Sequence, residues 1–365
     1  MTNTIRSVRN YLWGRAGMNN ERNYGIDFLR LVLMYMVCIL HTLGQGGVLD
    51  SCPVDSGKYK AFWLLEILCF SAVDGFAIIS GFFASDKPRK YEKLAEMWFQ
   101  VFFYSFILTM LFTIAGVNSD WPKTDIIKCA LPVTYEKFWY FTAFFALFFV
   151  IPILNKFVFA LNEQKSKIAF LVLILFSCMT LMADAFKVKN GYSTIWIMIL
   201  YCIGALAKRG RIFEGKSTRV LIVIWGICVL LTWWTKVFKG TNLLVNYVSP
   251  TILLSGLLMV IIFSRISLKG TIISRVSPLA FGIYLFQLNQ VIWGSLKNRV
   301  SFVGQFKFGK AVVYVAFFAM MIFVTGIFVE FVRNKLAKVC RISELSKKIV
   351  TMIKWILQKS TVILK

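Results

Sequence analysis

The chain has 365 residues, of which 58% are hydrophobic and only 16% are charged. A soluble domain carries about 25% charged residues, so this composition excludes an ordinary water-soluble fold. The formal charge of +25 would suit nucleic acid if the basic residues gathered on one surface. They lie instead in short segments between apolar runs, a distribution typical of membrane topology. We therefore expect an all-α integral membrane protein with the lipid bilayer, and no nucleic acid, as its partner.

About ten stretches are long and apolar enough to span a bilayer, which takes about 20 residues per helix. They cover residues 25–44, 61–84, 94–117, 138–161, 168–186, 191–208, 219–238, 244–263, 276–296 and 310–334. We expect an N-terminal arm over residues 1–24, one membrane domain over 25–335 and a tail over 336–365. The first apolar run lacks a small-residue cleavage site, so it is predicted to be a retained helix.

The basic residues predict the orientation of the chain. The N-terminal arm carries Arg6, Arg9, Arg15 and Arg22, and an excess of Lys and Arg marks cytoplasmic segments. Because ten spans place both ends on one side, both termini are expected in the cytoplasm. In the tail, apolar residues recur at helical spacing among lysines, which predicts an amphipathic helix on the inner leaflet, with a solvated basic tail as the alternative. These apolar residues are Ile349, Ile353, Ile356 and Leu357.

The eight cysteines lie mostly inside apolar segments, and the chain has one histidine. No spacing resembles that of metal ligands, so no metal site is expected. Cys52 and Cys129 fall in predicted outer loops. Whether they pair is left open by the sequence.

The first span holds Asp27, Arg30 and the single histidine, His41. His41 lies eleven positions after Arg30, which at about 100° per residue places the two on one helix face about 16 Å apart in depth. Ionisable residues at membrane depth are costly and usually face the bundle interior. A guanidinium binds phosphate and an imidazole exchanges a proton near neutral pH, so this face is a candidate catalytic path. A structural histidine is the alternative.

Two carboxylates in the second span are further candidates. Glu66 should lie at about the depth of His41, where it could orient or activate the imidazole, or merely sit at the interface. Asp74 lies deeper, beside Gly75 and Gly81, and could pair with Arg30 or cap a break in the helix.

Polar and aromatic groups in two later spans suggest contacts with an acceptor. Gln287 and Asn289 place hydrogen-bonding groups in the outer half of the ninth span, as links between helices or as sugar contacts. Trp139 and Tyr140 open the fourth span, where an aromatic belt or stacking on a sugar ring would explain them.

The pattern resembles the acyltransferase-3 family of membrane proteins. The family's opening signature matches Asp27-Phe-Leu-Arg30 followed after ten residues by His41, and three later segments match in order. They are Val73–Phe83, Phe138–Pro152 and Ser277–Phe286. The segment Gly44–Val48 is similar to members from Gram-positive surface-polysaccharide clusters.

The resemblance implies a ten-helix transferase of the bacterial plasma membrane that uses cytoplasmic acetyl-CoA, with Arg30 and His41 as the essential pair. Its acceptor would be a polysaccharide or a lipid-linked oligosaccharide. Arg89 and Lys90 on an inner loop are candidates to bind the donor with Arg30 and Asp74, although that loop departs from the family's arginine-rich stretch. A second departure is Gln287, where many members carry histidine.

Two other functions are compatible with the sequence. A flippase for lipid-linked sugars would use the buried charges as a proton relay, and a sensor or scaffold would depend on the basic tail. The sequence leaves open whether the chain forms a homo-oligomer.

Overall fold

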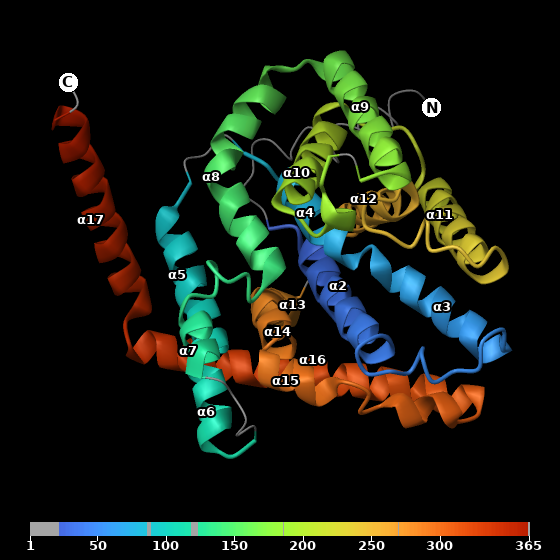
Figure 1. The fold of residues 1–365 in the computed structure, drawn as a ribbon. Coiled ribbons are helices and arrows are strands. Elements are labelled where there is room, and N and C mark those ends of the chain that lie inside the picture. Colours follow the sequence, from blue (N-terminus) through green and yellow to red (C-terminus); the bar gives the residue numbers. More distant parts are fainter. Residues whose placement is uncertain (1–21, 86–88, 118–122, 185, 269, 364–365) are drawn as a thin grey trace.

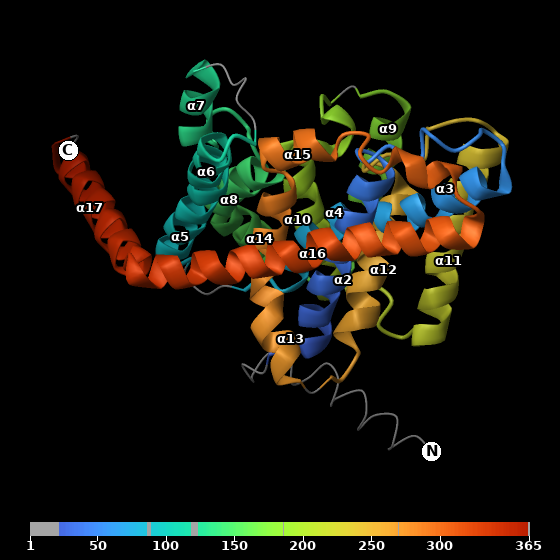
Figure 2. The same ribbon diagram turned by 90° about the horizontal axis from the view of Figure 1, so that it is seen from below.

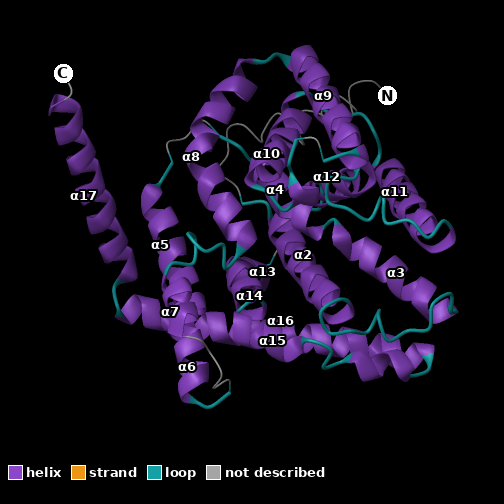
Figure 3. Ribbon diagram, in the orientation of Figure 1, coloured by secondary structure: helices purple, strands orange, loops and turns teal. Residues whose placement is uncertain are grey.

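The computed structural model describes residues 22–85, 89–117, 123–184, 186–268 and 270–363. Every regular element in these ranges is helical (Figures 1 and 3). The first half contains α2 (Tyr24–Leu43), α3 (Gly57–Phe70), α4 (Ala72–Phe82), α5 (Tyr91–Phe102), the π-helix η2 (Phe103–Ile107), α6 (Leu108–Ile114), α7 (Lys123–Ala130), α8 (Trp139–Ala160) and α9 (Glu163–Met182). The second half contains η3 (Lys189–Gly191), α10 (Thr194–Arg209), α11 (Thr218–Phe238), α12 (Pro250–Ser264), α13 (Thr271–Val276), η4 (Ser277–Leu279), α14 (Ala280–Gln287), α15 (Gln290–Leu296), η5 (Ser301–Gln305), α16 (Phe308–Val339) and α17 (Ile342–Ile363).

Polar side chains fix where several apolar helices begin. Asn23 accepts a hydrogen bond from the backbone N–H of Ile26 and caps α2. Asn162, Ser193 and Ser217 cap α9, α10 and α11 in the same way. Each cap satisfies one backbone donor that has no partner within the helix, which matters most where water is scarce.

All ten predicted spans are helical, but they differ in how far they could reach across a bilayer. Seven helices of the described chain are long and apolar enough to cross a membrane, and a bent pair, Thr271–Gln287 with Gln290–Gln305, would make eight. The pair bends by 70°. Helix α12 has 15 residues and α10 has 16, which at about 1.5 Å per residue is shorter than a hydrocarbon core of about 30 Å. The protein is a multi-pass membrane protein whose count of ten full spans stays a prediction, as does its orientation.

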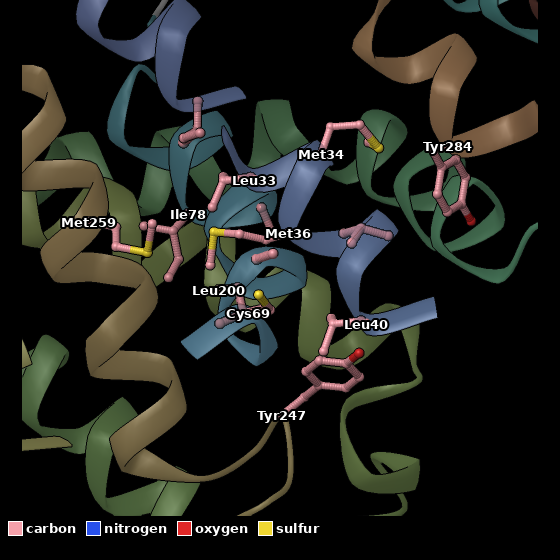
Figure 4. Packing of buried hydrophobic residues seen from close by; sticks show 14 of the residues in the cluster. Leu33, Met34, Met36, Leu40, Cys69, Ile78, Leu200, Tyr247, Met259 and Tyr284 are labelled. Atoms are coloured by element: carbon pink, nitrogen blue, oxygen red, sulfur yellow. The ribbon is translucent and has the colours of Figure 1, made fainter. Parts of the chain in front are cut away.

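Helix α2 lies in the middle of the bundle (Figure 1), where it packs against α3, α4, α12, α14 and α16. Figure 4 shows the core on one side of α2, where Leu33 and Met36 lie near Ile78, Leu200 and Met259. The side chains on the other side of α2 lie along a cavity that residues of α4 and α14 also line.

Glycines let α4 and α10 come into backbone contact. A Cβ atom built on Gly81 would lie 1.8 Å from the carbonyl oxygen of Tyr201, and one on Gly204 would lie 2.2 Å from that of Ile78. Small residues at such crossings are the usual basis of close helix packing in membranes. This contact fixes α4 next to α10, behind the central helix.

The tail forms the helix α17, which leaves the end of the long helix α16 (Figure 2) and packs against α5. Ser343 donates a hydrogen bond to Glu96 at 2.6 Å, and Lys354 lies 3.6 Å from Glu92. Its far side exposes apolar residues, among them Trp355. The amphipathic helix is present, and its place on the inner leaflet stays a prediction. The N-terminal arm lies outside the described residues as far as residue 21.

Candidate functional site

A cavity of about 720 Å³ opens along one face of α2. The helix contributes Asp27, Arg30, Met34, Val37 and His41 to its wall. Their spacing of three, four, three and four residues is that of a single helical stripe. The helical register predicts that Arg30 and His41 share a face, and the structure places both along this one cavity.

One end of the cavity is cationic. The Asp27 carboxylate accepts hydrogen bonds from Arg22, from Arg30 at 2.7 Å and from the Ser277 hydroxyl at 3.1 Å. Asp27 is 3% exposed, whereas the side chains of Arg22 and Arg30 are 45% and 39% exposed. Two guanidinium groups on one carboxylate leave a net charge of about +1, with donors still available to an anion.

The other end holds His41. Its Nδ1 lies 3.0 Å from the Oε1 of Gln287, and its ring meets the Trp293 ring edge to face with centroids 4.7 Å apart. Gln287 ends α14 and is fully buried, and its amide donates to the Met34 sulfur at 3.6 Å. The imidazole therefore contacts both Gln287 and Trp293 where it lines the cavity.

Aromatic side chains form the remaining wall of the cavity. Trp139 and Tyr140 come from the start of α8, while Tyr192 and Tyr247 come from the loops before α10 and α12. The rings of Trp139 and Tyr192 lie 4.8 Å apart, and those of Tyr192 and Tyr247 lie 5.1 Å apart. Flat aromatic faces with polar edges are suited to stacking against a ring that also carries hydroxyls.

The acyltransferase-3 family model, described as an acyltransferase domain, matches residues 23–330, which include every element that lines the cavity. The chain belongs to this family. No curated protein and no solved structure matches it. The acyltransferase is thus a membrane enzyme whose family match contains every described cavity-lining residue except Arg22.

Glu66 does not contact the imidazole of the acyltransferase. The residue that contacts the His41 Nδ1 is Gln287. The Oε2 atom of Glu66 is buried without a hydrogen-bond partner among the described residues. Equal depth in the membrane does not specify which face of a helix a residue occupies. A catalytic role for Glu66 stays a prediction, as does the alternative that it merely sits at the interface.

Asp74 does not pair with Arg30, whose carboxylate partner is Asp27. Asp74 is fully buried in the first turn of α4, accepts a hydrogen bond from the Trp196 indole at 3.4 Å and makes no capping hydrogen bond. Asp74 follows Val73 in the sequence; Val73 lines the cavity and Asp74 does not. The structure therefore supports neither of the two contacts expected of Asp74.

The inner-loop bases lie away from the cavity. Arg89 donates a hydrogen bond to the Tyr201 hydroxyl at 3.4 Å and lies over the Phe148 ring, while Lys90 is exposed at the start of α5. Neither is among the cavity-lining residues of the described chain. A role for them in binding the donor stays a prediction.

The four residues expected to contact an acceptor divide into two pairs. Trp139 and Tyr140 line the cavity. Gln287 contacts His41 rather than open space, and Asn289 uses its amide to bind the Tyr104 carbonyl oxygen and the Thr109 hydroxyl. Sugar binding stays a prediction for all four, with geometry that favours the aromatic pair.

Sequence reasoning missed Arg22, Tyr192, Tyr247 and Trp293 as site residues. Arg22 lies five residues before Asp27, a signal that could have been used, but it was counted only toward membrane orientation. The other three lie on loops or beyond the helix bend, where no local pattern indicates what they face.

The cysteines contribute no disulfide, since all eight are free, including Cys52 and Cys129. Within the described ranges no three His, Cys, Asp or Glu side chains lie close enough to hold a metal ion.

Proposed function

We propose that this enzyme transfers an acyl group, acetyl in the simplest case, from cytoplasmic acyl-CoA to a hydroxyl of a cell-surface or lipid-linked polysaccharide in the bacterial plasma membrane. Membership of the acyltransferase family supports the reaction class. The observation that carries the proposal is that one cavity joins the cationic pair Arg22 and Arg30 to His41.

The cationic end suits the donor. Coenzyme A carries phosphates that a guanidinium can bind through two parallel hydrogen bonds. Between Arg30 and His41 the stripe on α2 is apolar, with Met34 and Val37, so it suits the neutral arm that carries the thioester. Along the helix the two ends are about 16 Å apart, which separates phosphate binding from the reacting carbon.

His41 is proposed as the general base. It takes the proton of the acceptor hydroxyl as the oxygen attacks the thioester carbon, so that a C–O bond forms, the C–S bond breaks and the proton passes to the leaving thiolate. General-base catalysis of this kind contributes about 10²–10⁴-fold. A covalent acyl-histidine, formed and then attacked by the hydroxyl, is the variant in which the same atoms exchange in two steps.

The aromatic wall is proposed to receive the acceptor. Trp139, Tyr140 and Tyr192 present ring faces and polar edges on the cavity surface, a combination that suits a sugar ring with its hydroxyls. The sugar and the hydroxyl position would then be chosen by these contacts.

The test is to measure O-acetylation of surface polysaccharide in cells that carry His41→Ala or Arg30→Ala at normal expression. Both changes should abolish or strongly reduce the acetyl ester, by about 10²-fold or more for His41→Ala. Arg219→Ala is the matched control, because Arg219 is an exposed arginine at the start of α11. Full acetylation in either cavity variant would defeat the proposal.

A flippase for lipid-linked sugars is the competing function. It would have no reason to recognise a thioester donor, so binding of acetyl-CoA to the purified protein separates the two. Absence of binding, together with an unmodified polysaccharide in wild-type cells, would favour the flippase.

A further inference from the structure

We infer that Gln287 is a positioning residue that holds the His41 imidazole in one tautomer, with the proton on Nδ1 and with Nε2 left as the base. The inference rests on the proposed function. It assigns a part in the reaction to a side chain that belongs to another helix and is distant in the sequence.

The hydrogen-bond chain sets the tautomer. The Nδ1 of His41 lies 3.0 Å from the Oε1 of Gln287, and an amide oxygen only accepts, so Nδ1 must donate. The orientation of the amide is set in turn by its Nε2, which donates to the Met34 sulfur at 3.6 Å. A thioether has no proton to give, so the reversed amide would place its oxygen against the sulfur and lose that hydrogen bond, while its NH₂ could donate to Nδ1 only in the other tautomer.

Burial makes this selection effective. Gln287 is fully buried, with 0% of its surface exposed, so water cannot take its place beside Nδ1. In water the two tautomers of imidazole exchange readily, whereas a buried partner for one nitrogen decides which nitrogen carries the proton. Nε2 therefore keeps its lone pair for the acceptor hydroxyl.

A bend in the chain brings two contacts onto the same ring. Gln287 is the last residue of α14, and Trp293 lies in α15 beyond the 70° bend. The Trp293 ring meets His41 at 81°, with centroids 4.7 Å apart. In a straight helix, residue 293 would lie further along the helix axis from residue 287. The bend therefore allows the side chains of both Gln287 and Trp293 to contact His41.

Asn289 fixes the bend. Its Oδ1 accepts from the Val291 backbone N–H at 3.0 Å, and its amide donates to the Tyr104 carbonyl oxygen at 2.7 Å and to the Thr109 hydroxyl at 2.9 Å. Tyr104 lies in the π-helix η2, and the wider turn of a π-helix disturbs the regular backbone hydrogen bonds. Asn289 thus ties the break in one helix to the irregular turn of another.

The test measures label transferred from radioactive acetyl-CoA to polysaccharide by membrane vesicles, across a range of pH. Gln287→Leu removes the acceptor for Nδ1 and should lower the rate roughly 10- to 100-fold at every pH, a smaller loss than that of the base itself. Gln287→Glu keeps an acceptor and should restore the rate at high pH. Because its carboxylate favours the protonated imidazole, its pH–rate profile should move upward by about 1–3 pH units.

Gln290→Leu is the control, because it removes the same kind of side chain from the same bend without touching His41. Gln290 contacts Lys137 and Cys129. A wild-type rate in Gln287→Leu, or equal losses in the Leu and Glu variants with an unchanged pH profile, would overturn the inference. If Gln287→Leu does not fold, as judged by its melting temperature, the pH profile of Gln287→Glu decides alone.

The outcome for His41→Ala separates this inference from the proposed function. A full rate in His41→Ala would remove the base and with it both proposals. If His41→Ala is inactive and Gln287→Leu transfers acetyl groups at the wild-type rate, the proposed function stands and only the role of Gln287 is removed.

Discussion

At the scale of single residues, Asp27 organises the cationic end of the cavity. Its carboxylate binds Arg30 from the next turn of α2, Arg22 from before the helix and Ser277 from η4. A buried carboxylate shared in this way holds two guanidinium groups in place at the cavity mouth, so less of their freedom is lost when an anion binds. Arg22 therefore belongs, together with Arg30, to the surface that we propose binds the donor.

Removing the Arg22 side chain should weaken the binding of acetyl-CoA more than it slows the transfer reaction. We expect Arg22→Ala to raise KM for acetyl-CoA about tenfold with a small change in kcat, because one charge-assisted contact is lost at a partly exposed site. The KM of Arg22→Lys should lie between those of the wild type and Arg22→Ala, since lysine keeps the positive charge but cannot form two parallel hydrogen bonds to a phosphate. Initial rates in membrane vesicles measure both constants. An unchanged KM in Arg22→Ala, with Arg219→Ala as the reference, would exclude Arg22 from donor binding.

At the scale of elements, the contact of α4 with α10 supports the back of the cavity. Gly81 and Gly204 each face a backbone carbonyl of the other helix, so neither position has room for a side chain. Val73, Phe76, Ile79 and Ser80 of α4 line the cavity. Separation of the two helices would therefore move the wall as well as the core.

Gly204→Val should destabilise the fold by about 1–3 kcal/mol, the usual cost of overpacking, because its Cβ would lie 2.2 Å from the Ile78 carbonyl oxygen. The melting temperature of the detergent-solubilised protein should fall accordingly. Gly226→Val is the matched control, since a Cβ on Gly226 of α11 meets nothing within 4 Å. Equal melting temperatures for the two variants would show that the crossing tolerates a side chain.

At the scale of the whole molecule, the cavity and the tail are separate. No residue after Trp293 is among the described residues that line the cavity. Helix α17 contacts α5 on its outer side through Glu92 and Glu96. Within the described chain, the tail therefore contributes no side chain to the cavity.

A chain that ends after Val339 should keep at least about half of the acetyl transfer, because the cavity, its arginines and His41 are untouched. The measurement is polysaccharide O-acetylation per amount of protein in the membrane. His41→Ala in the same shortened chain serves as the inactive reference. Loss of transfer at normal protein level would instead support a sensor or scaffold that acts through its tail.

The sequence by itself determined the class of protein and the stripe of residues that α2 contributes to the cavity. Long apolar runs predicted membrane helices, and each of the ten predicted windows contains a helix, of which seven are long and apolar enough to cross a membrane. Within α2 the relation of Arg30 to His41 follows from 3.6 residues per turn, a local property that needs no knowledge of the rest of the chain. The same holds for Asp27, which lies three residues before Arg30.

Only the tertiary structure decided what surrounds that stripe. The partner of His41 Nδ1 is Gln287, 246 residues away in the sequence. The sequence suggested Glu66 for this place, because depth along a helix does not specify the direction a side chain faces. The bend after Gln287 and the short helices α10 and α12 also depend on packing against other elements. Helical periodicity is set by neighbouring residues, whereas the meeting of two helix faces is set by side chains from the whole bundle.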